Sequence, residues 1–276
     1  MNIWLTTSQG FLGQELLPRL SEKYSVVATT KAEVDLLDSN VVDSFIEKNK
    51  FDVIVHNAIK GGRRIKKDDA SVAYENILMY ENLVKHSSRV AKVINFDSAA
   101  CFDRRRSIHN CKETDLGKSV PIDYYGFSKM NIALRSLQVS NSYNLRLFNC
   151  FGPTETEDRM TKLNILRYIK NEDLVVFKNK WMDIFYIDDL WAVLDYYLCQ
   201  SAPPKDINLV YEEKNTLLDV AKMINESDDH KCKIVTLQDG FDHSYTGDPS
   251  LIKSLGLNFV GIKYGLRHMY DMLKES

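Results

Sequence analysis

Short apolar runs rich in β-branched residues alternate with amphipathic segments along the first half of the chain. The runs have the length and composition of strands, and the segments between them repeat their apolar residues at helical spacing. This alternation predicts a parallel sheet with helices on both faces, because parallel strands need long crossover connections. The predicted strands are 2–7, 24–30, 51–58, 91–99 and 143–149; the predicted helices are 12–23, 39–50 with Ser39 as its N-cap, 71–89, and one that begins near Tyr125.

After Phe151 the alternation becomes irregular. No sharp linker divides the chain, so we expect a doubly wound α/β domain, residues 1–150 with 183–210 returning to it. A smaller, interwoven C-terminal lobe is expected over 151–182 and 211–276. The elements expected in this half are a loop, helix and short strand over 154–177, helices over 186–200 and 215–227, a strand over 206–211, and two short amphipathic helices over 248–257 and 264–276.

The composition limits the class of partner. The chain has 276 residues, of which 27% are charged, and its formal net charge of −2 gives no basic field for nucleic acid or an anionic membrane. No apolar run approaches the ~20 residues that span a bilayer, and the N-terminus lacks the features of a signal peptide. The five cysteines include no C-x-x-C pair and indicate neither a disulfide framework nor a zinc site. We therefore expect a cytoplasmic protein with no metal, no nucleic acid partner and no membrane association.

A glycine-containing turn, "TTSQGFLGQELL", joins the first predicted strand to the first predicted helix. Dinucleotide-binding turns use three glycines, for the tight turn, for backbone approach to the pyrophosphate and for packing of the helix on the sheet. Gly10 and Gly13 fit the second and third positions, and Thr7 stands at the first. A phosphate there would meet backbone amides at the positive end of the helix. An ordinary strand-turn-helix is the alternative reading.

The second predicted strand ends in "VVATTK". NAD-specific sites usually place an acidic residue at this point, to bind the ribose 2′-hydroxyl. Thr30 and Lys31 occupy it instead, and a hydroxyl with a cation suits a 2′-phosphate better. This favours NADP(H) over NAD(H), although a lysine here can also be merely solvated.

Tyr125 and Lys129 lie four residues apart in "DYYGFSKMNIALRSL" and share one face of the predicted helix. A nearby cation favours the phenolate and lowers the pKa of a tyrosine from ~10. Such a tyrosine can exchange protons near neutral pH. The same spacing also arises by chance, as a half-buried tyrosine beside a solvated lysine. The other motifs of the chain are therefore needed to distinguish a catalytic pair from this alternative.

Several motifs agree in order and spacing along nearly the whole chain: "TSQGFLG", "VDLLD", "HNA", "NILMYENL", "INFDSAACF", "YGFSK", "LRLFNCFGP" and "DIFYIDDL". With them the chain resembles the extended short-chain dehydrogenase/reductase family, in particular its NAD-dependent epimerase/dehydratase group. It is most similar to nucleotide-sugar 4-keto reductases such as GDP-fucose synthase and dTDP-4-dehydrorhamnose reductase. The resemblance implies a Rossmann domain with a C-terminal substrate lobe.

The resemblance also implies roles for individual residues. Tyr125 is then the general acid and base, Lys129 lowers its pKa and holds the nicotinamide ribose, and Ser98 hydrogen-bonds the reacting oxygen. The cofactor-binding residues are Thr6, Gly10, Phe11, Leu12, Gly13, Thr30, Lys31, Asp35, Leu36, Asn57, Ala58, Asn76 and Phe148. The substrate-binding residues are Ala99, Ala100, Asn149, Lys162 and Lys180.

Several positions depart from the family pattern. Family dehydratases place Asp-Glu where Ala99 and Ala100 stand, so we do not expect a 4,6-dehydratase. Cys101 lies one residue beyond the position of an epimerising cysteine. The arginine that often clamps the substrate diphosphate is replaced by Met182, and the cations that could substitute for it are Arg159, Lys162, Lys178 and Lys180.

These features lead us to expect an NADP(H)-dependent reductase of a 4-keto nucleotide sugar that uses Ser98, Tyr125 and Lys129. The alternatives are a nucleotide-sugar 4-epimerase with tightly bound NAD and a non-catalytic regulator of the same fold that senses NADP(H). The family often pairs through the helices that carry Asn76 and Tyr125, which implies a homodimer. The basic runs "GGRRIKKDD" and "RRRSIHN" are expected in loops near the mouth of the site.

Overall fold

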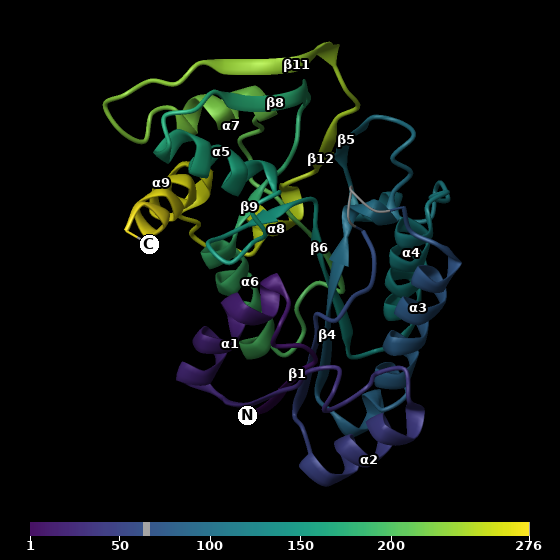
Figure 1. Ribbon diagram of the computed structural model, residues 1–276. Helices are drawn as coiled ribbons and strands as arrows, with labels where there is room; N and C mark the ends of the chain where they lie inside the picture. Colours follow the sequence, from purple (N-terminus) through teal and green to yellow (C-terminus); the bar gives the residue numbers. More distant parts are fainter. Residues whose placement is uncertain (63–66, 276) are drawn as a thin grey trace. The chain divides into compact units, whose positions relative to one another are not determined.

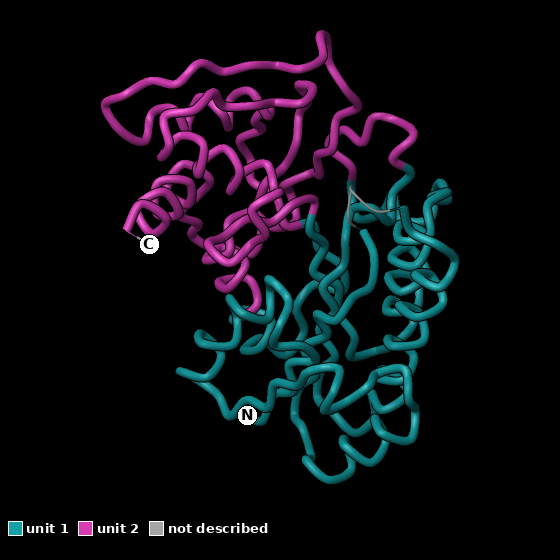
Figure 2. Tube along the Cα trace, viewed as in Figure 1, with its two compact units in different colours: residues 1–103, 112–147, 195–208 teal, residues 104–111, 148–194, 209–276 magenta. Residues whose placement is uncertain are grey.

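The computed structural model describes residues 1–62 and 67–275 (Figure 1). These residues form two compact units, and Figure 2 colours them separately. The first unit comprises 1–103, 112–147 and 195–208, and the second comprises 104–111, 148–194 and 209–276. The predicted domain limits stay a prediction; the compact units assign 104–111 and 183–194 to the second unit. Residues 63–66 of the first basic run lie outside the described residues.

A parallel sheet forms the centre of the first unit, as the alternation of strands and helices predicts. In the described part of the chain it has six strands in the order β10-β6-β4-β3-β1-β2. The strands are β1 (Asn2–Leu5), β2 (Ser25–Ala28), β3 (Val53–His56), β4 (Lys92–Ser98), β6 (Ser142–Leu147) and β10 (Asp206–Leu209). The side chains of β3 are buried at all four positions, which is expected for a parallel strand covered on both faces.

Helices cover both faces of this sheet. They are α1 (Phe11–Lys23), α2 (Ser39–Asn49), α3 (Ala70–Val84) and α4 (Tyr124–Gln138). In Figure 1 α3 and α4 lie side by side on one face, and α1 lies on the other. Under α2, the Trp4 ring stacks on Phe51 with centroids 5.6 Å apart and is tilted against Phe45 at 4.9 Å. These aromatic contacts fix the first strand against its helical cover.

Two helix boundaries differ from the prediction. Asp38, and not Ser39, is the N-cap of α2, because its carboxylate accepts hydrogen bonds from the amides of Asn40 at 2.9 Å and Val41 at 3.2 Å. Ser39 is already helical, so its hydroxyl cannot take the capping position. The helix predicted over 71–89 ends at Val84, and a separate 3₁₀ turn, η1 (Ser87–Arg89), follows.

The second unit combines short helices with paired short strands. Its elements are β5 (Ile108–Cys111), β7 (Cys150–Phe151), α5 (Met160–Ile169), β8 (Leu174–Asn179), β9 (Phe185–Tyr186), the start of α6 (Ile187–Cys199), α7 (Leu217–Ile224), β11 (Ile234–Phe241), β12 (Tyr245–Gly247), α8 (Ser250–Ser254) and α9 (Gly261–Lys274). The strands pair as β8 with β11, β5 with β12, and β7 with β9. The prediction missed the strands β5, β7, β9, β11 and β12, and β5 corrects the loop expected at "RRRSIHN". Most residues of β11 are exposed, so its sequence has no continuous apolar run.

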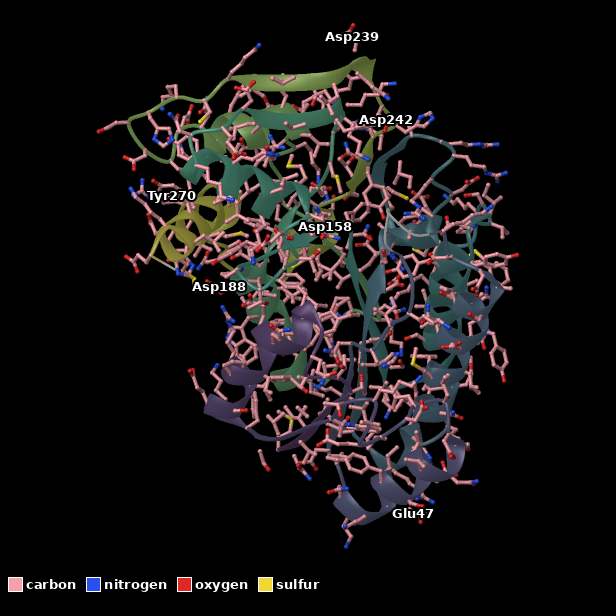
Figure 3. All side chains as sticks on the ribbon, viewed as in Figure 1. Glu47, Asp158, Asp188, Asp239, Asp242 and Tyr270 are labelled. Atoms are coloured by element: carbon pink, nitrogen blue, oxygen red, sulfur yellow. The ribbon has the colours of Figure 1, made fainter. Side chains whose placement is uncertain are left out.

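The last helix, α9, begins three residues before the predicted start because Asp189 caps it. The Asp189 carboxylate accepts hydrogen bonds from the amides of Val260 at 2.8 Å and Gly261 at 3.0 Å. Tyr270 on α9, labelled in Figure 3, donates a hydrogen bond to Asp228 at 2.7 Å and packs edge-on against Tyr168. Among the described residues, no helix combines the length and apolar character needed to cross a membrane.

Candidate active site

The carboxyl ends of β1 and β3 are joined by a polar network. Here the strand order changes direction, which is where open α/β sheets bind their ligands. Thr6 Oγ1 accepts hydrogen bonds from the amides of Asn57 at 3.1 Å and Ala58 at 3.2 Å. The Asn57 side chain accepts from Thr7 N at 2.9 Å and donates to Thr7 O at 2.8 Å. Asn57 therefore holds the turn after β1 through both backbone groups of Thr7.

This turn tolerates a threonine at the first position of the glycine motif. The non-glycine residues with positive φ in the described chain are Lys50, Asn110 and Asn171, so Thr7 needs no left-handed backbone. Gly13 has no such freedom, because a Cβ there would lie 2.3 Å from Thr7 O. The glycine lets α1 rest directly on the turn.

Gly10 opens the space in front of α1. A Cβ on Gly10 would meet no heavy atom nearer than 3.9 Å. Gly10 is also the N-cap of α1, and no side chain caps the amides at the start of this helix. Phe11 and Leu12 are the first two residues of α1, so their amides have no acceptor within the helix. The turn therefore fits the diphosphate of a dinucleotide, which would complete the hydrogen bonding of the helix start.

The segment after β2 carries two acidic groups, Asp35, which is one of the predicted cofactor-binding residues, and Glu33, which the sequence reading missed. Thr30 donates from its amide and its hydroxyl to Glu33 Oε2, at 2.7 and 2.9 Å. Lys31 Nζ lies 3.8 Å from Asp35 Oδ2, and its side chain is 75% exposed. Leu36 is buried. An anion bound at Thr30 would therefore replace the Glu33 carboxylate.

Ser98 and Tyr125 lie on two segments that touch. Ser98 ends β4, and its hydroxyl oxygen accepts a hydrogen bond from Ala100 N at 3.2 Å. Ala99 and Ala100 are buried in the 3₁₀ turn η2 (Ala99–Cys101). A Cβ on Gly126 would lie 2.4 Å from Ala100 O, so the first turn of α4 sits directly on η2. This contact brings Tyr125 to the end of β4.

Lys129 is buried one helical turn further along α4. Its Nζ donates a hydrogen bond to Phe96 O on β4 at 2.7 Å. Burial lowers the pKa of Lys129, and the nearby Asp97 opposes that shift. The ammonium is thus fixed to the backbone of the strand that ends in Ser98, with further protons available to a ligand.

Asn76 on α3 bonds to two other segments of the first unit, while its part in cofactor binding stays a prediction. Its side chain accepts from Lys60 N at 2.8 Å and donates to Lys60 O at 2.9 Å. It also donates to Ser128 Oγ on α4 at 3.2 Å. Asn76 therefore ties the segment after β3 to the helix that carries Tyr125.

A buried charge cluster beneath these residues escaped the sequence reading. Arg146 on β6 is fully buried, and it donates to Asp97 at 2.8 Å and to both carboxylate oxygens of Asp206 at 2.8 Å. Burial raises the pKa of Asp206 to about 6. Asp97 and Arg146 face each other in the strand register. The signal in the sequence was a charged residue within each of three predicted strands, Asp97, Arg146 and Asp206.

The remaining predicted residues belong to the second unit. Phe148 is buried, and its ring packs edge-on against Tyr245. Lys180 Nζ lies 5.9 Å from the centroid of the same Tyr245 ring. Lys162 Nζ donates to the carbonyls of Pro153 at 2.7 Å and Glu155 at 2.9 Å. Their parts in cofactor and substrate binding stay predictions.

Asn149 is paired with a cation inside the second unit. Its side-chain oxygen accepts a hydrogen bond from Arg159, one of the cations that could replace the arginine missing at Met182. Arg159 Nε also lies 3.6 Å from the buried Glu155 carboxylate. Met182 itself is buried, so it offers no polar group to a ligand.

Residues 3–209 match the sequence profile described as NAD dependent epimerase/dehydratase family. Because this match covers most of the chain, the protein belongs to that family. A search of curated protein sequences finds no match.

Solved structures support the same fold. A GDP-D-glycero-L-gluco-heptose synthase from Campylobacter jejuni, solved in the presence of NADPH, matches with a TM-score of 0.87 at 17% identity over 100% of this chain and 98% of its own. A GDP-mannoheptose C4 reductase from the same organism, with NADP bound, matches with a TM-score of 0.83 at 18% identity over 99% and 98%. A Thermus thermophilus UDP-glucose 4-epimerase in complex with NAD matches with a TM-score of 0.78 at 18% identity over 98% of each chain.

Arg146→Met tests the buried cluster. It leaves the Asp97 and Asp206 carboxylates buried without their cation, and we expect a loss of roughly 3–5 kcal/mol in the free energy of unfolding. The matched control is Arg135→Met, which breaks the half-exposed pair of Arg135 with Glu81 and should cost less than about 1 kcal/mol. Urea unfolding measures both values. Equal losses in the two variants would contradict the role given to Arg146.

Proposed function

We propose that the protein is an NADP(H)-dependent reductase of a 4-keto nucleotide sugar. The observation that carries the proposal is the packing of α4, which carries Tyr125 and Lys129, on the end of β4, which carries Ser98, in a chain of the NAD dependent epimerase/dehydratase family. The nicotinamide, when bound, supplies the hydride. The open space before Gly10 and the network around Asn57 support a dinucleotide at the adjoining strand ends.

Ser98, Tyr125 and Lys129 would bind the reacting oxygen and supply its proton. The Ser98 oxygen already accepts from Ala100 N, so its own O–H is free to donate to the reacting carbonyl oxygen. Tyr125 gives its proton to the oxygen as charge develops there. Lys129, fixed by Phe96 O, places a positive charge one helical turn from Tyr125 and favours the resulting phenolate.

A 4-epimerase with tightly held NAD is the second candidate. It would use the same three residues to oxidise and re-reduce one carbon. The fold similarity to an NAD-bound UDP-glucose 4-epimerase favours this reading. An epimerase should retain NAD through purification, whereas a reductase should oxidise added NADPH. A regulator that senses NADP(H) should bind it without turnover.

A 4,6-dehydratase is not supported. Ala99 and Ala100 follow Ser98 in η2, and both are buried apolar residues. They cannot abstract or return a proton. Cys101, which lies one residue beyond the position of an epimerising cysteine, is also fully buried. Its burial raises the pKa of the thiol well above its usual range, which disfavours a part in proton transfer.

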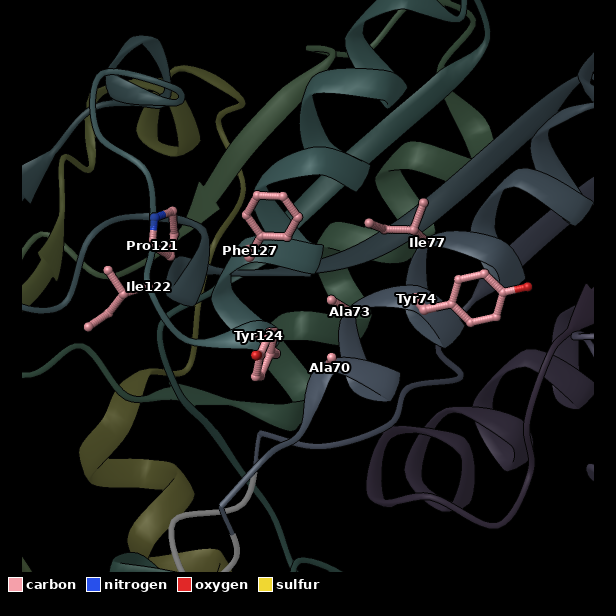
Figure 4. A pocket seen from close by; sticks show the side chains of 8 residues that line it. All are labelled: Ala70, Ala73, Tyr74, Ile77, Pro121, Ile122, Tyr124 and Phe127. Carbon is pink, nitrogen blue, oxygen red and sulfur yellow. The ribbon is translucent and has the colours of Figure 1, made fainter.

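We also propose a homodimer formed through α3 and α4. An apolar groove lies along these helices, and Figure 4 shows its side chains. Its lining residues are Ala70, Ala73, Tyr74, Ile77, Pro121, Ile122, Tyr124 and Phe127. Tyr74 is 66% exposed and Ile122 is 69% exposed, and both line this one groove, so they form an exposed apolar patch of the kind that marks an interaction site.

Tyr125→Phe tests the general acid. Loss of the phenol should lower kcat by about 10²–10⁴-fold while NADPH still binds. The matched control is Tyr124→Phe, which removes the neighbouring, exposed phenol and should keep kcat within a few fold of the parent. NADPH oxidation is followed with UDP-, dTDP-, GDP- and CDP-linked 4-keto sugars, and calorimetry measures cofactor binding. Activity of Tyr125→Phe within a few fold of the parent would refute the assignment.

Cofactor preference is tested at the end of β2. A contact of Lys31 with a 2′-phosphate should make NADPH bind about tenfold tighter than NADH, and Lys31→Ala should remove most of that difference. Glu33→Gln should increase the preference, because a phosphate at Thr30 would no longer compete with a carboxylate. Calorimetry with both cofactors on the three proteins decides this. Equal affinities in the parent would mean that Lys31 is only a surface lysine.

Tyr74→Glu combined with Ile122→Glu tests the homodimer. Charges in the groove should separate the subunits, so light scattering at micromolar concentration should fall from twice 31.8 kDa to 31.8 kDa. Phe177→Glu, at a position 62% exposed in the second unit, is the control and should leave the dimer intact. A parent protein that is already monomeric would rule the dimer out.

A further inference from the structure

Gly62 lies against the ring of Tyr125. A Cβ built on Gly62 would be 2.9 Å from both Cε2 and Cζ of Tyr125 and 3.1 Å from Cδ2. Real Cβ atoms do not approach other atoms so closely, so no side chain fits here while Tyr125 keeps its place. Cζ is the ring atom that bears the phenolic oxygen. The close approach is therefore at the reactive edge of the ring.

The backbone of Gly62 is held in this position from two sides. Its amide donates a hydrogen bond to Asp68 Oδ2 at 3.0 Å. Two residues earlier, both backbone groups of Lys60 bond to Asn76, which also bonds to Ser128 on α4. The segment that presses on Tyr125 is thus attached to the helix that carries Tyr125.

The conformation of Gly62 adds a second constraint. Its φ is +77°, a region that residues with a side chain rarely adopt. Gly61 has nearly the same φ, +78°, but a Cβ there would meet the side chains of Asp68 and Val72 and not Tyr125. Backbone strain and contact with the tyrosine are therefore separable at two neighbouring positions.

We propose that Gly62 is a positioning residue that sets the orientation of the Tyr125 phenol for proton transfer. This inference rests on the proposed function, in which Tyr125 is the general acid. Proton transfer requires the hydroxyl to lie within hydrogen-bonding reach of the substrate oxygen. The Gly62 backbone packs against one side of the ring. A methyl group added at Gly62 would therefore force the phenol to rotate or to move away.

The test compares Gly62→Ala with two alanine variants of equal backbone strain. Gly117→Ala has φ +82°, and its methyl group would make an ordinary contact of 3.6 Å with Leu134. Gly61→Ala would place its methyl group against Asp68, which holds the Gly62 amide, and against Val72. It therefore tests an indirect disturbance of the same segment, with no methyl group on the tyrosine ring. Each variant places a side chain at positive φ, so all three should lose stability in urea unfolding. Gly61→Ala and Gly62→Ala should lose more than Gly117→Ala, because their methyl groups would also collide with neighbouring side chains.

Gly62→Ala should lower kcat by roughly 10–100-fold relative to Gly117→Ala, with the KM of the sugar substrate within about threefold of the parent. In a Tyr125→Phe background, Gly62→Ala should cost little more, because the group it displaces is already gone. A kcat of Gly62→Ala that matches that of Gly117→Ala would overturn the proposal.

Fluorine NMR provides a readout that does not depend on turnover. The protein is labelled with 3-fluorotyrosine, and Tyr125→Phe identifies the Tyr125 resonance by its loss. That resonance should shift in Gly62→Ala and stay in place in Gly117→Ala. If it shifts while no sugar nucleotide is reduced, the contact stands and the proposed reaction fails. If it does not shift, the positioning role is wrong even in an active reductase.

Discussion

The buried Arg146 guanidinium is the interaction on which the rest of the first unit depends. A charge without water must be matched, and Asp97 and Asp206 match it from the strands on either side. The Phe102 ring, just after η2, lies 5.0 Å from the guanidinium carbon. One side chain thus links β4, β6, β10 and the segment after Ser98. Asp97 is adjacent to Ser98, and Lys129 is bonded to Phe96, so the register of β4 places two of the three catalytic candidates.

Close approaches of backbone to backbone or ring assemble the site around this frame. At Gly13 and Gly126, a methyl group would collide with the carbonyl oxygens of Thr7 and Ala100. At Gly62 it would collide with the Tyr125 ring. The first contact packs α1 against the turn after β1, and the second packs α4 against the turn after β4. The third places the Gly62 backbone against the Tyr125 ring. Glycine is required at these places by contact, whereas Gly10 leaves open space for a ligand.

The cofactor end of the site shows why charge alone is a weak guide to preference. Thr30 and Lys31 favour a 2′-phosphate when read as isolated residues. In the folded chain Glu33 accepts both hydrogen bonds of Thr30, and Asp35 lies near the Lys31 ammonium. Neighbours of similar fold bind NADPH, NADP or NAD. In our proposal, a 2′-phosphate at this place would have to compete with these carboxylates.

The sequence by itself determined the parallel sheet, its helices and the family. It also predicted the Ser98, Tyr125 and Lys129 set, which stays a prediction. These depend on local periodicity and on short motifs whose spacing is preserved along one helix or one strand end. Tertiary structure alone decided the Asp97–Arg146–Asp206 cluster, the clamp of Asn57 on Thr7 and the contact of Gly62 with Tyr125. The physical reason is that each of these joins residues far apart in the chain. Their energies come from burial and close approach, and a linear sequence shows neither until the strands are placed side by side.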